Sequence, residues 1–280
     1  MMKVSYYPGC SAHGTGVELD ESTRDLCRML DVELVELKDW SCCGASSAHV
    51  KSEKLALGLA GLNLAAAEAE GRDLVTPCPA CFSRLSSARR HVLDHGAIPG
   101  VEQLNGQTPV RHILHLFSRP EVMEKLAERS SGVLRGLKAV CYYGCLFTRP
   151  PEITESAHPE NPTEMERILS ALGMKALDWP YKTVCCGGSL TLPDADQVAR
   201  LCHPIFDMAR RVGAEAIVTG CPMCFMNLER QWAADARDDL LPIYYFTELM
   251  MLALDPQRAA SYFRRHLSDS TRALASRGLE

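Results

Sequence analysis

The chain has 280 residues, of which 46% are hydrophobic and 23% charged, and its formal net charge is −5. A chain of this length can bury a substantial core, in one large domain or in two of ordinary size. The slightly acidic balance, without any long run of like charges, gives no indication of binding to nucleic acid or to an anionic membrane.

The N-terminus, from Met1 to Tyr7, lacks the charged and then apolar layout of a signal peptide. The longest apolar stretch, near Leu55 to Ala67, is interrupted by glycine and asparagine, whereas a membrane-spanning helix needs about 20 apolar residues. We therefore expect a cytoplasmic protein without a membrane span. Stable disulfides are rare in a reducing compartment, so the cysteines are expected to be free or bound to metal.

The first half of the chain alternates apolar strands with amphipathic or alanine-rich helices. In chain order we expect strand Val4–Tyr7, helix Thr15–Leu30, strand Glu33–Leu37, helix Val50–Glu70, strand Asp73–Thr76, a helix from about Pro79, and an apolar helix from Pro109 to Leu116.

The second half repeats this order. It predicts strand Ala139–Tyr143, helix Thr163–Leu172, strand Lys175–Leu177, helix Ala195–Val212, strand Ala216–Thr219, a helix from Pro222, and an apolar helix from Pro242 to Leu249. Alternating strands and helices predict an α/β fold in which each half is a small, mostly parallel sheet with flanking helices.

The repetition divides the chain into four segments. We expect a first cysteine-rich domain over residues 1–108, a linker helix region over 109–136, a second cysteine-rich domain over 137–254, and a polar helical tail over 255–280. The tail is interpreted as a solvated end-helix rather than a docking element.

Ten of the thirteen cysteines form two copies of one pattern. From the adjacent pair onward, each cysteine of the first copy maps onto the second by adding 143, so the chain is predicted to be an internal duplication. The first copy consists of Cys10, Cys42, Cys43, Cys78 and Cys81, and the second of Cys145, Cys185, Cys186, Cys221 and Cys224.

The adjacent pairs are poor candidates for disulfides. Consecutive Cα atoms lie about 3.80 Å apart, below the roughly 4.4 Å minimum usual for a disulfide. A tight turn, which Gly44 and Gly187 permit, could instead aim both sulfurs at neighbouring metal atoms.

The Cys-x-x-Cys pairs are predicted to lie where a strand runs into a helix, whose free N–H groups stabilise thiolate. Structural zinc and an ordinary four-iron cubane each take four ligands, so a fifth sulfur indicates a cluster of unusual shape or a spare redox-active thiol. We expect a metal in each half and favour iron–sulfur over zinc, with zinc in one half as the alternative.

The motifs C-x31-CCG-x33-C-x2-C and C-x39-CCG-x33-C-x2-C resemble the duplicated CCG domains of heterodisulfide reductase, in its subunit designated B. The resemblance extends over nearly the whole chain and includes Tyr143-Gly144-Cys145-Leu146 and Asn161-Pro162-Thr163. It implies that each five-cysteine set holds one noncubane [4Fe-4S] cluster, that the ten cysteines are the ligands, and that the clusters lie near the domain interface.

The resemblance also implies a reaction and partners. The family cleaves a disulfide into two thiols, with one electron supplied through each cluster, and we expect Cys10, Cys43, Cys145 and Cys186 to be catalytic. The chain has no ferredoxin run of C-x2-C-x2-C-x3-C-P and no convincing nucleotide-binding glycine pattern. Electrons would then come from the iron–sulfur subunit designated C in that family. This subunit would in turn receive its electrons from the flavin subunit designated A.

Two alternatives remain open. CCG sets also occur in subunits of lactate, glycolate, succinate or fumarate oxidoreductases, and a metal-stapled scaffold could dock partners without catalysis. The natural disulfide and the direction of the reaction are not predicted.

A few residues outside the ligand set are also of interest. Cys27, Cys141 and Cys202 are predicted to be buried, with a role near the second cluster as the alternative for Cys141. His13 and His49 lie close to cluster loops and could donate protons. Arg149 and Lys182 could bind an anionic substrate, although surface or loop-capping roles are favoured.

Overall fold

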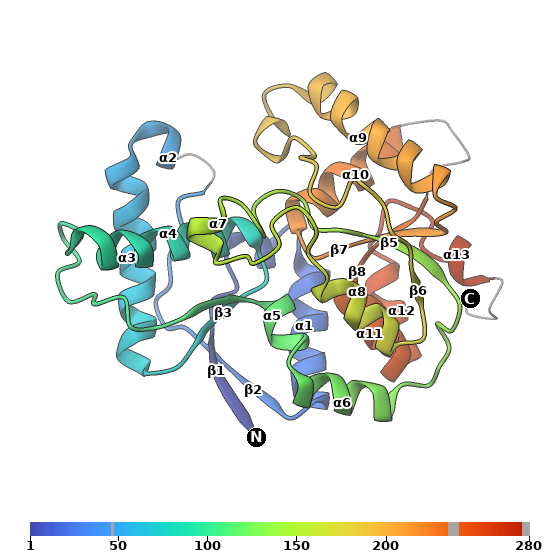
Figure 1. Cartoon of the computed structure of the whole chain (residues 1–280), viewed down its shortest axis with the longest axis horizontal. Coiled ribbons are helices and arrows are strands. Elements are labelled where there is room, and N and C mark those ends of the chain that lie inside the picture. The colour runs from blue at the N-terminus through green and yellow to red at the C-terminus, as the bar shows by residue number, and fades with distance from the viewer. Residues whose placement is uncertain (46–47, 235–240, 276–280) are drawn as a thin grey trace. The chain divides into compact units, whose positions relative to one another are not determined.

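The structure is a computed structural model that describes residues 1–45, 48–234 and 241–275. The chain forms two compact units, each built around its own sheet (Figure 1). The first unit comprises Met1–Leu116 and Leu146–Pro159, and the second comprises Phe117–Cys145 and Glu160–Glu280.

The first unit contains a four-stranded parallel sheet in the order β2-β1-β3-β4. Its strands are β1 (Met2–Tyr6), β2 (Val32–Glu36), β3 (Leu74–Thr76) and β4 (Val110–His112). The three residues of β3 are fully buried, which is typical of a central parallel strand covered on both faces.

Helices connect and flank these strands. They are η1 (Cys10–His13), α1 (Val17–Met29), α2 (Ala48–Lys51), α3 (Glu53–Glu70), α4 (Pro79–His95), α5 (Ile113–Phe117) and α7 (Pro151–Thr154). The Ser52 side chain caps α3 by accepting from the Leu55 N–H, and Gly71 ends the helix in a left-handed conformation. Pro79 occupies the first turn of α4, where its missing N–H costs no helical hydrogen bond.

The second unit has a four-stranded parallel sheet of the same topology, in the order β6-β5-β7-β8. Its strands are β5 (Lys138–Tyr142), β6 (Lys175–Ala176), β7 (Ala216–Thr219) and β8 (Ile243–Tyr245). In both units the first strand in sequence lies second in the sheet, so the fold repeats along with the cysteine pattern.

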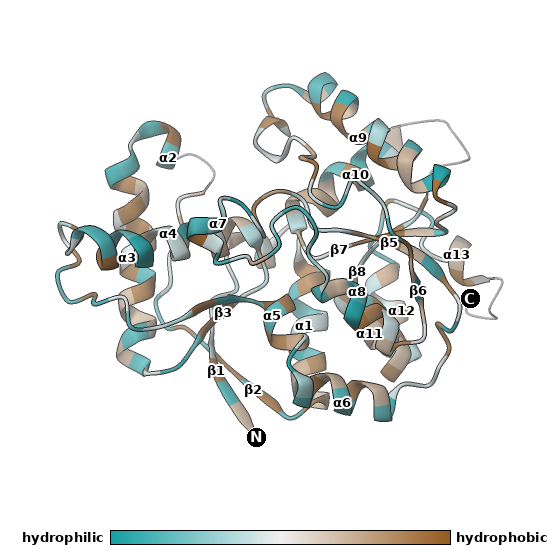
Figure 2. Ribbon diagram, in the orientation of Figure 1, coloured by the Kyte–Doolittle hydropathy of each residue, from teal (hydrophilic) through white to brown (hydrophobic). Residues whose placement is uncertain are grey.

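The helices of the second unit are α6 (Pro120–Arg129), α8 (Glu164–Ala171), η2 (Gly188–Leu190), α9 (Ala195–Arg211), α10 (Pro222–Ala234), α11 (Phe246–Leu254), α12 (Pro256–Phe263) and α13 (Arg272–Ala275). Asp194 caps α9 by accepting from the Gln197 N–H. In Figure 2 hydrophilic and hydrophobic residues alternate around α9, as expected for a helix with one face on the core.

The predicted α/β class and duplicated parallel sheets are confirmed, but the fourth strand of each sheet was missed. Val110–His112 and Ile243–Tyr245 were expected to begin apolar helices, whereas they form β4 and β8 and are followed by α5 and α11. A three-residue apolar strand directly followed by a helix gives no periodicity that separates the two. The helix predicted from Val50 to Glu70 is also divided, because α2 ends at Lys51 and α3 begins after Ser52.

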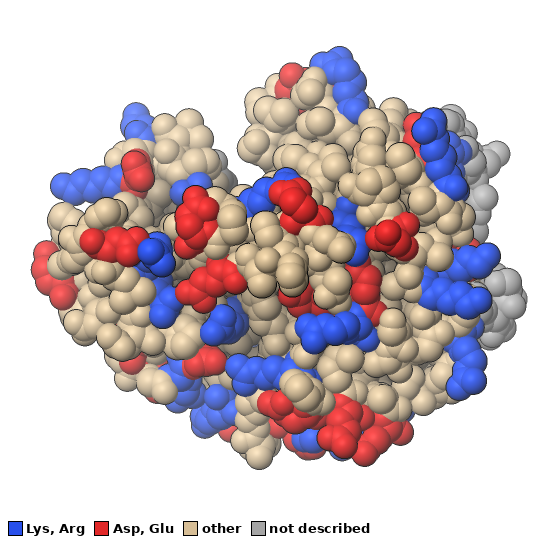
Figure 3. Space-filling model, in the orientation of Figure 1, with Lys and Arg blue, Asp and Glu red and all other residues tan. Residues whose placement is uncertain are grey.

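Charges of both signs are mixed over the molecule. On the face shown in Figure 3, Lys and Arg side chains lie next to Asp and Glu. Oppositely charged side chains also form ion pairs, such as Lys3–Glu33 at 2.7 Å and Arg90–Asp94 at 2.6 Å. Within the described ranges, none of the helices combines the length and apolar character that crossing a membrane requires.

The tail packs against the second unit, which corrects its interpretation as a solvated end-helix. Tyr262 on α12 and Leu274 on α13 are buried, although residues 276–280 lie outside the described part. Glu229 on α10, itself only 2% exposed, accepts hydrogen bonds from the Ser268 N–H and hydroxyl and from the Leu267 N–H. The tail is therefore attached through a buried carboxylate that contacts one turn of backbone.

Glu229→Leu is expected to lower the free energy of unfolding by ~3 kcal/mol, because buried donors left without an acceptor cost about 1–3 kcal/mol each. Urea unfolding would give the loss, and hydrogen exchange should rise over residues 255–275. Glu128→Leu, which removes an exposed carboxylate from α6, serves as the control and should change neither measurement. Equal stability of the two variants would contradict the anchoring role.

Candidate metal centre

The first cysteine set lies entirely within the first unit, at the carboxyl ends of its parallel strands. The carboxyl ends of parallel strands meet at one edge of the sheet, which brings distant segments together. The Cys43 and Cys81 sulfurs, 38 positions apart in sequence, lie 3.3 Å apart. The five members are Cys10 after β1, Cys42 and Cys43 after β2, and Cys78 and Cys81 between β3 and the first turn of α4.

The second set repeats this arrangement within the second unit. Two pairs of sulfurs are close: those of Cys186 and Cys224 lie 3.5 Å apart, and those of Cys145 and Cys185 lie 3.9 Å apart. The members are Cys145 after β5, Cys185 and Cys186 in the loop after β6, and Cys221 and Cys224 between β7 and the first turn of α10. All ten predicted ligand positions therefore lie beyond the carboxyl ends of strands, five in each unit, and their role as metal ligands stays a prediction.

Exposure divides each set in the same way. The buried members of the two sets are Cys43, Cys78, Cys81, Cys186, Cys221 and Cys224, and the accessible ones are Cys10, Cys42, Cys145 and Cys185. A molecule that approaches either set from solvent thus meets the leading cysteine and the first cysteine of the adjacent pair.

A glycine precedes each leading cysteine because a side chain there would occupy the space of a buried sulfur. Gly9 and Gly144 have φ of +72° and +68°, a conformation that L side chains rarely adopt. A Cβ atom built on Gly9 would lie 3.0 Å from the Cys81 sulfur, and one on Gly144 would lie 2.7 Å from the Cys224 sulfur. The backbone therefore approaches the sulfur of the Cys-x-x-Cys helix as closely as packing allows.

The glycine after each adjacent pair donates a backbone hydrogen bond to sulfur. The Gly44 N–H lies 3.4 Å from the Cys42 sulfur, and the Gly187 N–H lies 3.3 Å from the Cys185 sulfur. In the second set, a hydrogen bond with Cys145 and, to a lesser extent, this Gly187 N–H lower the pKa of Cys185, because donors stabilise negative charge on sulfur.

A buried tyrosine at the end of the leading strand fixes each loop. The Tyr7 hydroxyl donates to the Ser41 carbonyl at 2.6 Å, and the Tyr142 hydroxyl donates to the Val184 carbonyl at 2.7 Å. Each acceptor is the residue immediately before the adjacent cysteine pair. This repeated contact was missed from the sequence, although the tyrosine three residues before each leading cysteine was a visible signal.

Hydrogen bonds between thiols favour thiolate at some positions and thiol at others. A hydrogen bond with Cys81 lowers the pKa of Cys43 to about 7, and the same bond raises the pKa of Cys81 well above its usual range. A hydrogen bond with Cys145 lowers the pKa of Cys185 to about 5. The thiolate is the form that binds metal, so each set includes a cysteine whose lowered pKa favours metal binding near neutral pH.

The two sets differ in the side chain that faces the second cysteine of the pair. Asn227 on α10 donates its amide to the Cys186 carbonyl at 3.2 Å and approaches the Cys186 sulfur at 3.6 Å. Its counterpart in the first copy is Arg84, whose positive charge contributes to the lowered pKa of Cys43. Sequence reasoning singled out neither residue, since a lone Asn or Arg three positions after a cysteine carries no motif.

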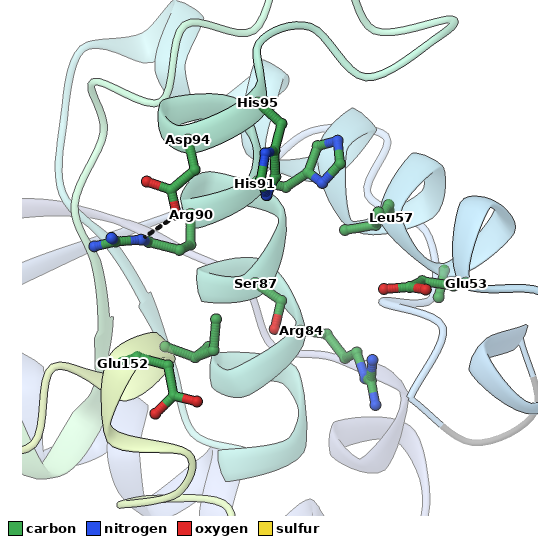
Figure 4. A pocket seen from close by; sticks show the side chains of 11 residues that line it. Glu53, Leu57, Arg84, Ser87, Arg90, His91, Asp94, His95 and Glu152 are labelled. Carbon is green, nitrogen blue, oxygen red and sulfur yellow. Dashed lines mark hydrogen bonds and ion pairs between the residues drawn. The ribbon is translucent and has the colours of Figure 1, made fainter.

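A cavity of about 360 Å³ lies beside α4 in the first unit (Figure 4). Arg84, Ser87 and His91 project from α4, and Glu53 and Leu57 on α3 lie on the other side of the cavity. Its lining carries both signs of charge, so it suits a small polar molecule better than an apolar one. Arg84 belongs both to this lining and to the surroundings of Cys43.

Other residues named from the sequence lie in different surroundings. Cys27 and Cys202 are buried in α1 and α9, as predicted, and Cys141 is buried on β5. His13 is exposed and stacks on Trp40 with ring centroids 5.6 Å apart, next to the Cys10 turn. Its role as a proton donor, and that of His49 on α2, stay predictions.

The surroundings of the cysteines fit a polynuclear cluster. Glycine N–H groups point at sulfur, thiolate is favoured at several positions, and the sulfurs lie in separate close pairs. A cluster with several metal atoms accepts sulfurs at several separate points, which suits these separate pairs.

Two segments of the chain, residues 4–86 and 139–229, match the family described as CCG: Cysteine-rich domain. The chain belongs to the CCG cysteine-rich domain family. The matches cover more than half of the chain, and each contains one complete five-cysteine set. The internal duplication predicted from the cysteine spacing is thereby a duplication of the CCG domain.

Several curated proteins are similar to this CCG chain over most of its length. The 8-methylmenaquinol:fumarate reductase membrane anchor subunit of Wolinella succinogenes is 28% identical over 89% of this chain and 91% of its own. The subunit designated B of the ferredoxin/F(420)H(2)-dependent CoB-CoM heterodisulfide reductase of Methanosarcina acetivorans is 26% identical over 91% and 90%. A protein of Archaeoglobus profundus described as like that heterodisulfide reductase subunit is 25% identical over 93% and 94%. The resemblance to this subunit of heterodisulfide reductase is confirmed.

A solved structure shares the fold. A hypothetical protein from Helicobacter pylori superimposes with a TM-score of 0.68 over 95% of this chain, at 13% sequence identity. This chain spans only 51% of that protein, and the likeness concerns the fold alone.

Proposed function

We propose that this CCG chain is the iron–sulfur subunit of an oxidoreductase complex that reduces, or forms, a disulfide at two noncubane [4Fe-4S] clusters. The observation that carries the proposal is the presence of two complete five-cysteine sets, each gathered at one edge of its own sheet. The relatives named for heterodisulfide reductase support the sulfur-directed chemistry. Zinc in one half is the minor alternative.

The chain's own residues would hold and orient the clusters. The ligands would be the ten cysteines of the two sets, with the thiolates of Cys43, Cys185 and Cys186 favoured by hydrogen bonds from neighbouring thiols. The glycines that follow each pair would keep their N–H groups on sulfur, which stabilises the more negative state of a ligand. When bound, the clusters supply one electron each, and two electrons with two protons convert a disulfide into two thiols.

Access from solvent indicates where a substrate sulfur could approach. Cys10, Cys42 and Cys185 are exposed and Cys145 is partly exposed, whereas Cys43 and Cys186 are buried. The catalytic roles proposed for Cys10 and Cys145 thus agree with accessibility. Cys43 and Cys186 would act as buried ligands, and any part they take in catalysis would pass through the metal.

Electrons would reach the chain from partner proteins. The direct electron donor would be an iron–sulfur partner, the one designated C in heterodisulfide reductases. This partner would receive its electrons from a flavin partner designated A. Relatives of similar length are named as subunits of reductase complexes, which supports the need for such partners. We place the complex in the cytoplasm as part of the same proposal.

A second function is favoured by one specific observation. The fumarate reductase subunit of Wolinella succinogenes is as similar to this chain as the heterodisulfide reductase subunits are. The chain could therefore transfer electrons within a succinate or fumarate oxidoreductase, or within a lactate or glycolate enzyme, without itself binding a disulfide.

The test is anaerobic purification of the full chain with its neighbouring subunits, followed by metal analysis and assays. Two four-iron clusters predict roughly eight irons per chain. Reduced viologen should be oxidised when a panel of disulfides is added, and not when fumarate is added. Stoichiometric zinc without iron would overturn the cluster assignment, and turnover with fumarate alone would favour the second function.

A further inference from the structure

The second unit contains a buried ion pair beside its cysteine set. Lys182 is only 6% exposed, and its Nζ lies 2.7 Å from Glu166 Oε1. The same ammonium donates to Asn161 Oδ1 at 2.7 Å and to the Pro162 carbonyl at 3.3 Å. Lys182 is therefore held inside the unit by one ion pair and two hydrogen bonds and does not present its charge to a substrate in solvent.

Glu166 and Tyr143 extend the pair to the segment that carries the leading cysteine. The Tyr143 hydroxyl donates to the other carboxylate oxygen of Glu166 and accepts from the Met165 N–H at 2.7 Å. The Tyr143 N–H donates to the Lys182 carbonyl at 2.8 Å. Burial and the Glu166 charge together raise the pKa of Cys141, so the thiol on β5 also faces this carboxylate.

The contacts of this pair join the two segments that deliver accessible sulfurs. Tyr143 lies two residues before Cys145, and Lys182 lies three residues before Cys185. The sulfurs of these two cysteines are 3.9 Å apart. A charged pair with several hydrogen bonds, shielded from water, holds its groups in one geometry, because any other arrangement leaves a buried charge without a partner.

In the first cysteine set, the positions that correspond to Tyr143 and Lys182 hold other residues. Counted from the cysteines, Pro8 occupies the place of Tyr143, and Asp39 occupies the place of Lys182. Asp39 is exposed and has the opposite charge. The two copies thus share the ten cysteine positions but differ at these two neighbouring positions, and the buried Lys182 belongs to the second copy.

We propose that Lys182 and Glu166 form a positioning pair for the second cysteine set, which fixes the Cys145 and Cys185 segments relative to each other and makes the second metal centre unequal to the first. The inference rests on the proposed function only for the presence of a cluster. The positioning itself concerns the protein's own backbone and sulfurs. The pair contacts the segments that carry the cysteines and acts through them rather than by contact with a substrate.

The test uses a variant that removes the pair without leaving a buried charge. Lys182→Met combined with Glu166→Gln keeps the volume and a hydrogen-bond acceptor for Tyr143, whereas Lys182→Met alone would strand the carboxylate. Lys175→Met, which removes an exposed lysine from β6, is the matched control. All chains are purified anaerobically at full length and checked for folding by circular dichroism.

Two measurements separate positioning from general stability. In chains stripped of metal, iodoacetamide labelling of Cys145 and Cys185, followed by peptide mass spectrometry, should accelerate roughly tenfold in the double variant, while Cys10 and Cys42 change less than about twofold. In loaded chains, electron paramagnetic resonance should show one cluster signal altered and the other unchanged.

The labelling results test the positioning role of Lys182 and Glu166 independently of the proposed function. Unchanged labelling of Cys145 and Cys185 in a folded double variant, or an equal acceleration at all four cysteines, would overturn the positioning role. If the unaltered chain binds no iron, the proposed function fails, but the labelling comparison still tests the pair. The Lys175→Met control should match the unaltered chain in both measurements.

Discussion

Replacing Cys186 by serine is expected to abolish turnover and to lower the iron content of the chain by about half, because under the proposed function one of two clusters would lose a buried ligand. The Cys186 sulfur lies 3.5 Å from that of Cys224 and is almost fully buried, so no solvent ligand can take its place. A serine oxygen is a harder and less acidic donor than a thiolate and is a poor substitute for iron–sulfur binding. Iron analysis and disulfide-dependent viologen oxidation would measure the two effects.

Cys202 provides the matched control for this substitution. It is a fully buried thiol on α9 whose sulfur lies 3.6 Å from the Cys186 carbonyl, yet it belongs to neither set. Cys202→Ala should keep the full iron content and lose stability by about 1 kcal/mol, the typical effect of a small core deletion. The cluster assignment fails if Cys186→Ser retains all of its iron and its turnover.

The corresponding substitution in the first unit, Cys43→Ser, tests whether both cysteine sets are needed. Cys43→Ser should also halve the iron content, since Cys43 occupies the corresponding buried position 3.3 Å from Cys81. If both clusters are needed to deliver two electrons, each single variant abolishes turnover. A non-catalytic scaffold would instead lose stability and keep turnover of the complex.

The sequence was most informative where chemistry constrains spacing. The constant spacing between cysteines identified both sets, because residues that were to bind one metal centre would have to come together whatever the surrounding fold. The order of strands and helices predicted the duplicated parallel sheets, since β7 (Ala216–Thr219) is a continuous apolar run that stops at a glycine. Both signals are local and depend on few assumptions about packing.

Long-range contacts were beyond the reach of a single sequence. The pairing of Tyr142 with the Val184 carbonyl joins residues 42 positions apart, and Asn227 reaches Cys186 from 41 positions away. Lys182 was expected at a surface or loop, whereas Glu166 and Asn161 from separate segments enclose its charge. Such contacts follow from the topology of the sheet, which brings strand ends together. No local sequence pattern predicts them.

The exposure of individual sulfurs was also unpredictable. Within the adjacent pair, Cys42 is exposed and Cys43 is buried, although the two have identical chemistry and neighbouring positions. The difference arises because successive side chains in an extended or turning segment point to opposite sides. Which side faces the core is decided by packing against α3 and α4, which the spacing of cysteines does not encode.

Gly144→Ala is expected to prevent the second set from binding its cluster, with loss of about half the iron and of turnover. Two effects combine. Gly144 has φ of +68°, where an L side chain costs roughly 1–2 kcal/mol, and its Cβ would lie 2.7 Å from the Cys224 sulfur. Real Cβ atoms do not approach so closely, so the buried Cys224 side chain or the Cys145 loop must move.

Gly213→Ala separates the clash with sulfur from the backbone strain. Gly213 has a similar φ of +79° in the same unit, but nothing lies within 4 Å of the position of its Cβ. It should lose the same ~1–2 kcal/mol of stability and keep all of its iron. Gly9→Ala should be milder than Gly144→Ala, because its Cβ would lie 3.0 Å from the Cys81 sulfur. Iron analysis and chemical unfolding of the three variants measure both effects, and an iron loss as large in Gly213→Ala as in Gly144→Ala would show that strain alone, rather than the space reserved for sulfur, explains the glycine.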